Sequence, residues 1–268
     1  VEDVKKACTN DNISAIVLRV DSPGGDAMAS DYIADIVRQY KDKKPIIVSQ
    51  GMVAASGGYW LSMDAHKIVA TPQTITGSIG VISSFMYDKG MMDSLGISYD
   101  VIKKGKYADL GSSWTLPLLP IFGLPVRPMT ADERTQNENS IKSLYTDFVN
   151  KVATGRKMSY DKVHEVAQGR IWAGTTGKTI GLVDEIGSLA TAIDLAKESA
   201  GITKDDNVDI YEYPAPKLFD FSMFMPKLFG VDITKATKEM TMLEFMMKNN
   251  GLPMPVLGLD MLDLIEQR

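Results

Sequence analysis

Two glycine-rich turns carry the residues whose types and spacing best suit chemistry. The first is Asp21-Ser-Pro-Gly-Gly25, which follows an aliphatic run, and the second is Gly51-Met-Val-Ala-Ala-Ser-Gly-Gly-Tyr59. A serine that opens a helix after a strand lies where backbone N–H groups converge, and those donors and the helix dipole can stabilise an oxyanion. Ser56 is therefore a candidate nucleophile. Close packing of a helix on a sheet needs the same small residues, so the turns alone leave both interpretations open.

The segments around these turns alternate between strand and helix patterns. Residues 14–21 form an almost continuous aliphatic run, typical of a strand buried on both faces. An amphipathic helix is expected at 26–41, a strand at 46–49, a helix at 54–65 and a third strand at 67–70. Strands and helices that alternate at this spacing predict parallel βαβ units and an α/β fold.

The second half of the chain is predicted to be mainly helical. Thr130 and Glu133 have the spacing of a capping box, which predicts a long helix that runs to about residue 154. A last strand is expected at 208–213. Methionines concentrate in residues 223–261, and such Met-rich faces adapt to irregular partners.

Three motifs in one order resemble the signal peptide peptidase A family. They are Val20-Asp-Ser-Pro-Gly-Gly25, Ala54-Ala-Ser-Gly-Gly-Tyr59 and Thr76-Gly-Ser-Ile-Gly-Val81. Shorter matches continue to residue 187, so the resemblance covers roughly residues 13–200. It implies a crotonase/ClpP-like fold of repeated ββα/βαβ units. Residues 1–200 would form this domain, with its N-terminus truncated, and 201–268 a family-specific C-terminal strand and Met-rich, helical extension.

The resemblance also implies a role for each matching residue in a serine–lysine dyad. Ser56 would be the nucleophile, and Ser78 would hydrogen-bond the general-base lysine. Gly24 or Gly25 would line the oxyanion hole together with the amide of Gly57. A serine hydroxyl is a weak nucleophile without such a base, and a lysine can serve if burial lowers its pKa.

The sequence departs from the family pattern at the base. Ala108 stands where single-length family members carry the lysine, and Lys106 lies two residues away. Along an extended segment, two residues move a side chain by about 6–7 Å on the same face. Three explanations compete. The chain is the serine-bearing C-terminal half of a double-length enzyme whose lysine lies upstream, or Ala108 is an engineered replacement, or Lys106 moves in by a local shift.

The amino-acid composition limits the classes of partner and ligand that we expect. The net charge is −5 and no basic stripe accompanies the aromatic residues, so we expect no nucleic-acid partner. Cys8, His66 and His164 share no ligand spacing, so we expect no metal site and no cofactor. The apolar, proline-broken segment 114–126 is expected to pack on its own protomer, cover a substrate groove, contact another subunit or dip into a bilayer.

The leading functional expectation is a serine endopeptidase that degrades hydrophobic peptides such as cleaved signal peptides. The family resemblance implies a homo-oligomeric ring on the extracytoplasmic side of the bacterial inner membrane. Because the chain begins with Val1 rather than Met, we expect a fragment whose membrane anchor is missing. Two alternatives stay open: a crotonase-type acyl-CoA enzyme, and a non-catalytic scaffold that binds peptides.

Overall fold

The computed structural model describes residues 1–87, 90, 94, 96, 101–110, 125 and 127–214. The chain divides into two compact units, Val1–Tyr213 and Pro214–Arg268, and every element below belongs to the first. The Met-rich extension and most of segment 114–126 lie outside the described residues. The predicted boundary after residue 200 stays a prediction.

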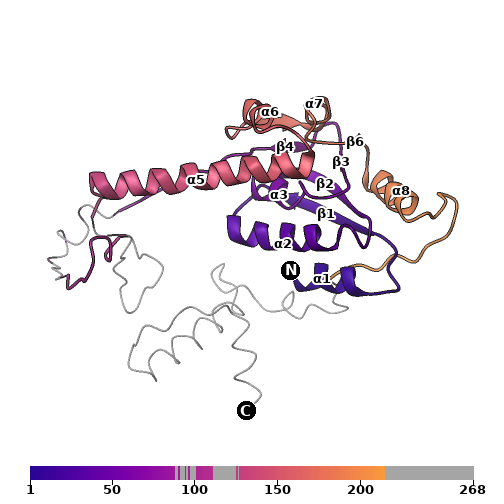
Figure 1. The fold of residues 1–268 in the computed structure, drawn as a ribbon, viewed down its shortest axis with the longest axis horizontal. Coiled ribbons are helices and arrows are strands. Elements are labelled where there is room, and N and C mark those ends of the chain that lie inside the picture. The colour runs from indigo at the N-terminus through magenta and orange to yellow at the C-terminus, as the bar shows by residue number, and fades with distance from the viewer. Residues whose placement is uncertain are drawn as a thin grey trace, which may run out of the picture. The chain divides into compact units, whose positions relative to one another are not determined.

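One six-stranded sheet organises the first unit (Figure 1). Its central strand β2 pairs with β1 along one edge, and with β3 and then β4 along the other. The outer strands β6 and β5 pair with β3 and β4, and only the β4–β5 pairing is antiparallel. The strands are β1 Ile16–Ser22, β2 Ile46–Ala55, β3 Lys67–Ala70, β4 Ile75–Gly77, β5 Ile171–Ala173 and β6 Glu185–Ile186.

Helices cover both faces of the sheet. They are α1 Glu2–Thr9, α2 Ala27–Tyr40, α3 Gly57–Trp60, α5 Ala131–Arg156, α6 Tyr160–Val166, α7 Gly174–Thr179 and α8 Leu189–Ser199. Ile47 packs against α8, whereas Val48 packs into the larger core with α3 and α5. Because successive side chains of a strand point to opposite faces, a strand covered on both faces must be apolar throughout.

Helix α5 joins the core through its C-terminal part. Phe148, Val149 and Val152 are buried there, and the ring of Phe148 stacks on Trp60 at 4.3 Å between centroids. At the other end the predicted capping box is confirmed. The Thr130 hydroxyl accepts from the Glu133 amide, and the Glu133 carboxylate accepts from the Thr130 amide.

Two predicted elements are wrong. The helix expected at 54–65 is only Gly57–Trp60, because β2 continues to Ala55 and its last residues pair with β4. The strand expected at 208–213, which was part of the C-terminal region, does not form. Its residues are exposed, and an exposed segment without a neighbouring strand has no ladder to join. No helix in the described part of the chain is long and apolar enough to cross a membrane.

Candidate active site

Ser56 lies at the junction between β2 and α3 in a strained backbone conformation. Its φ is 52° and its ψ is −118°, and a non-glycine residue in such a region costs about 1–3 kcal/mol. The surrounding structure holds it there, since its amide donates to the Gly77 carbonyl at 2.9 Å and its carbonyl accepts from the Trp60 amide at 2.9 Å. The residue is half-buried.

The turn after β1 packs directly on Ser56. A Cβ on Gly24 would lie 2.7 Å from the Ser56 Cβ and 3.1 Å from its Oγ. A Cβ on Gly57 would lie 3.3 Å from the Gly25 nitrogen and 2.5 Å from the Ser30 Oγ. A Cβ at either position would force neighbouring atoms to shift, so glycine at both positions lets the two turns pack this closely.

The backbone donors at this contact differ in how they are used. The Gly24 amide donates to the Ser22 hydroxyl at 3.2 Å. Within the described residues, neither the Gly25 N–H nor the Gly57 N–H donates to a protein acceptor. The Gly57 nitrogen directly follows Ser56, and the Gly25 nitrogen would lie 3.3 Å from a Cβ on Gly57, so two backbone amides without a protein acceptor lie close to Ser56. The Ser22 contact was not anticipated from the sequence, although a serine two residues before a glycine commonly makes such a turn.

Ser78 lies next to Ser56 at the same edge of the sheet. Ala55 and Gly77 are paired on the parallel strands β2 and β4, so Ser56 and Ser78 are the next residue on each. Ser78 also has a positive φ, 49°, and its amide donates to the Arg170 carbonyl at 2.8 Å. The structure thus brings together the two serines and the three glycines named from the sequence.

Lys106 is placed differently. Its side chain is 71% exposed and forms an ion pair with Asp132, whose carboxylate also accepts from the Tyr107 hydroxyl at 2.6 Å. The hydrogen bond to Asp132 raises the pKa of the Lys106 ammonium, which is opposite to what a general base needs. Among the described residues, the ammonium contacts Asp132 and Tyr107 and neither serine. Ala108 is exposed in the same loop.

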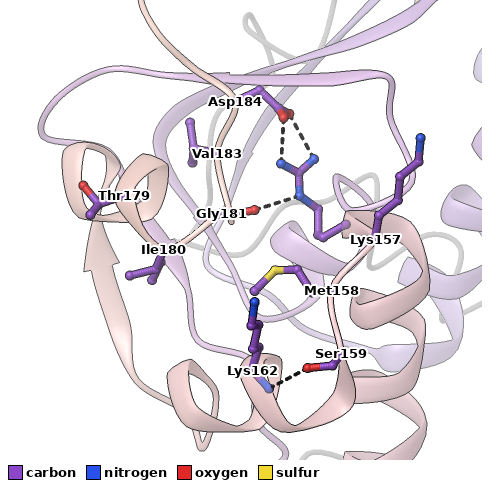
Figure 2. A pocket seen from close by; sticks show the side chains of 10 residues that line it. Lys157, Met158, Ser159, Lys162, Thr179, Ile180, Gly181, Val183 and Asp184 are labelled. Atoms are coloured by element: carbon purple, nitrogen blue, oxygen red, sulfur yellow. Dashed lines mark hydrogen bonds and ion pairs between the residues drawn. The ribbon is translucent and has the colours of Figure 1, made fainter.

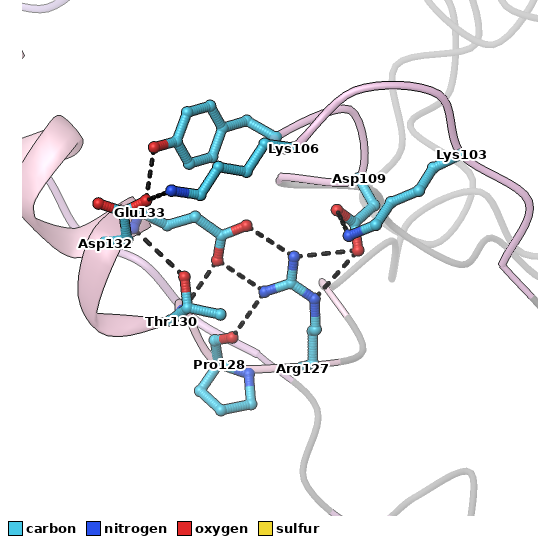
Figure 3. A network of polar contacts seen from close by, with 9 residues as sticks. Lys103, Lys106, Asp109, Arg127, Pro128, Thr130, Asp132 and Glu133 are labelled. Carbon is cyan, nitrogen blue, oxygen red and sulfur yellow. Dashed lines mark hydrogen bonds and ion pairs between the residues drawn. The ribbon is translucent and has the colours of Figure 1, made fainter.

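Figure 3 shows that Lys106 belongs to a polar network at the start of α5. Arg127 donates to both Glu133 oxygens at 2.7 Å and contacts Asp109 at 3.0 Å, while Lys103 bonds Asp109 at 2.7 Å. The neighbouring Arg127 lowers the pKa of Glu133 to about 2. The network anchors residues 103–109 to the first turn of α5.

A pocket of about 650 Å³ lies elsewhere, between the end of α5, α6 and the segment after α7 (Figure 2). None of the motif residues lines it. Its most buried polar contact joins Arg156 to both oxygens of Asp184 at 2.9 and 3.0 Å. Asp184 also accepts from the Ile68 amide at 2.7 Å, so the pair ties α5 to the sheet. In the described part of the chain, no group of three or more His, Cys, Asp or Glu side chains is placed to hold a metal ion.

The family model of peptidase family S49 matches residues 38–203, which is more than half of the chain. The chain belongs to peptidase family S49. The resemblance to signal peptide peptidase A is thereby confirmed, and with it the α/β fold class of the ClpP and crotonase type. The predicted helical, Met-rich C-terminal extension lies outside the residues that the structure describes.

Three S49 relatives show the extent of the similarity. The chain is 37% identical over 216 residues to the chloroplastic serine protease SPPA of Arabidopsis thaliana, covering 81% of this chain and 30% of that protein. It is 35% identical over 221 residues to Protease 4 of Salmonella typhi, covering 82% and 33%. For Protease 4 of Haemophilus influenzae the identity is 32% over 254 residues, covering 94% and 38%. The chain thus spans about a third of each of these relatives.

The solved structures that match the S49 chain include a ClpP protein. A mutant of ClpP1 from Listeria monocytogenes superposes with a TM-score of 0.44 at 16% sequence identity, covering 70% of this chain and 82% of that one.

Proposed function

We propose that this S49 chain carries the nucleophile of a serine endopeptidase, and that Ser56 is that nucleophile. The observation that carries the proposal is the contact between the Ser56 hydroxyl and the glycine turn at 24–25. Attack by Oγ on a peptide carbonyl creates a negative oxygen, and preorganised amide donors stabilise it. The Gly25 and Gly57 amides are the donors best suited to this, since the Gly24 amide is already used by Ser22.

The base of the proposed dyad is a lysine from outside residues 101–110. Support comes from Lys106, whose charge is held by Asp132 and whose pKa is raised. Ser78 directly follows β4, as Ser56 directly follows the paired β2, and it is the residue that would orient the incoming ammonium. Of the three origins weighed above, a lysine from the upstream half of a longer protein fits this arrangement best.

Hydrophobic peptides are the proposed substrates, with cleaved signal peptides as the class that the family resemblance implies. Large apolar side chains stand exposed close to each site motif. Met28 is 66% exposed three residues after Gly25, and Met52 is 74% exposed four residues before Ser56. Exposed apolar groups beside a nucleophile favour apolar chains over charged ones. The proposed setting is a homo-oligomeric ring at the extracytoplasmic face of the bacterial inner membrane.

The test uses the full-length protein that contains this chain. Ser56→Ala should abolish cleavage of an apolar fluorogenic peptide and should abolish labelling by a serine-directed phosphonate. Ser199→Ala, an exposed serine on α8, is the matched control and should keep both. Cleavage that survives Ser56→Ala would overturn the proposal. Peptide binding without turnover by the unmodified full-length protein would replace it with the scaffold interpretation.

A further inference from the structure

Strand β2 changes partners at a bulge that lies just before the nucleophile. Its first half pairs with β3 at residues 47–49, and its last residues pair with β4 at 53–55. Along the other edge, Val20 pairs with Gln50 but Ser22 pairs with Ala54. Between these two pairs β1 advances by two residues and β2 by four. The two extra residues of β2 form a bulge that redirects the strand toward Ser56.

The exposed Asp21 side chain lies against this bulge. Its Oδ1 accepts a hydrogen bond from the Val53 amide at 3.1 Å. A Cβ on Gly51 would lie only 2.5 Å from the Asp21 Cγ, so residue 51 must be glycine while the carboxylate is there. In a regular ladder the Val53 amide would donate to a backbone carbonyl of β1. The bulge removes that acceptor, and the Asp21 carboxylate accepts the hydrogen bond instead.

Asp21 also begins the turn that carries the glycine donors. From its own backbone the chain runs through Ser22 to Gly24 and Gly25, while its side chain holds Val53, three residues before Ser56. On the opposite edge of β2, the buried Thr74 hydroxyl donates to the Gly51 carbonyl at 2.8 Å and secures the bulge from that direction. One residue thus links the segment of the nucleophile to the segment of the amide donors.

We propose that Asp21 is a positioning residue of the peptidase reaction, which sets the distance between the Ser56 hydroxyl and the Gly25 amide through the β2 bulge. It acts through Val53 and touches neither substrate nor nucleophile. The inference rests on the function proposed above. Because a displacement of 1 Å in a reacting group can cost on the order of 10²-fold in rate, a loosened bulge should be visible in kcat.

The experiment measures kcat, KM and the rate of phosphonate labelling at Ser56 in the full-length protein. Asp21→Ala removes the acceptor and should lower kcat and the labelling rate by roughly 100-fold, with KM within about threefold. Asp21→Asn keeps an oxygen that can accept from Val53 and should retain kcat within about tenfold. The exposed Asp42→Ala is the matched control and should behave as wild type.

A second pair of variants tests the contact itself. Gly51→Ala should reproduce the loss of Asp21→Ala, because the new methyl group displaces the carboxylate. In the double variant the methyl group occupies the vacated space, so the combined loss should be no greater than either single loss. Strong non-additivity of this kind is the signature of two residues in direct contact.

The outcomes separate this inference from the proposed function. If wild type cleaves and Ser56→Ala does not, the function stands. An unchanged kcat in Asp21→Ala, or an equal loss in Asp21→Asn, would then overturn the role of Asp21. If Asp21→Ala fails to fold, Asp21→Asn decides alone, since a loss near 100-fold in a folded protein refutes the hydrogen-bond argument. If wild type neither cleaves nor labels at Ser56, both proposals fall.

Discussion

The Ser56 amide donates a hydrogen bond to the Gly77 carbonyl at 2.9 Å, and this contact joins the two serine motifs. It continues the parallel β2–β4 ladder by one residue beyond Ala55 and Gly77. The sheet therefore fixes the position of Ser56. Gly77, which accepts this hydrogen bond, is followed directly by Ser78. A change at Gly77 should reach both serines.

Gly77→Ala should damage stability and activity together. Gly77 has a φ of 82°, and an added Cβ would lie 2.9 Å from the Trp172 Cδ1. We expect a loss of at least about 1 kcal/mol in the free energy of unfolding, because alanine disfavours this conformation. We also expect at least a tenfold loss of kcat/KM, because Ser56 shifts with its partner carbonyl. Urea denaturation and peptide cleavage measure the two effects.

Asp42→Ala, at an exposed position, is the control for that change. It should leave the unfolding midpoint unchanged. If Gly77→Ala matches this control in both measurements, the β2–β4 contact does not position the serine.

The elements that position Ser56 were predictable where the pattern is local. The run at 14–21 and the capping box of Thr130 and Glu133 each signal one structure, and both form. Residues 51–55 are less informative, because small residues suit the start of a helix as well as a bulged strand. The sequence pattern predicts a helix from residue 54. In the structure residues 53–55 instead extend β2, because they pair with β4. Strands β5 and β6, with three and two residues, carry no periodic signal of their own.

The sequence predicts the candidate site as a set of residues and not as a set of contacts. The match to the family motifs proposes Ser56, Ser78 and the glycines, but it does not choose between the Gly24 and Gly25 amides. That choice depends on the Ser22 hydroxyl. In the same way, the sequence offers Lys106 as a candidate base but gives no sign of its ion pair with Asp132, 26 positions later in the chain.

Lys106→Met should leave peptide cleavage within about twofold of wild type, since surface substitutions away from a site have small effects. The substitution removes an exposed charge that is paired with Asp132 rather than with Ser56. The measurement is kcat/KM across pH 6 to 10 in the full-length protein. A loss of several hundred-fold, or a shift of the basic limb of the pH profile, would instead identify Lys106 as the base.

The Arg127–Glu133 contact should make stability depend on acid pH. Arg127 lowers the pKa of Glu133 from its usual 4.5 to about 2, and the Glu133 side chain is only 2% exposed. Because the folded-state pKa is the lower one, the stabilisation is fully present above pH 4.5 and is lost as the pH falls toward 2. Glu133→Gln should therefore lower the urea midpoint at pH 6, and the difference from wild type should shrink below pH 4.5.

Glu138→Gln tests whether that effect is specific, because Glu138 is exposed on the same helix. Its midpoint should follow wild type at every pH. A Glu133→Gln difference that stays constant from pH 6 to pH 3 would contradict the assignment to the ionised pair.

Gln50→Met should stabilise the protein. Gln50 lies beside the β2 bulge at 1% exposure, and neither its Nε2 nor its Oε1 has a hydrogen-bond partner among the residues that the structure describes. A buried polar group without a partner costs about 1–3 kcal/mol, and methionine fills nearly the same volume without polar demands. We expect the free energy of unfolding to rise by about 1 kcal/mol in urea denaturation. Exposed Gln136→Met should change it by less than about 0.5 kcal/mol. A lower midpoint for Gln50→Met would mean that the buried amide is satisfied in solution by a group such as an ordered water.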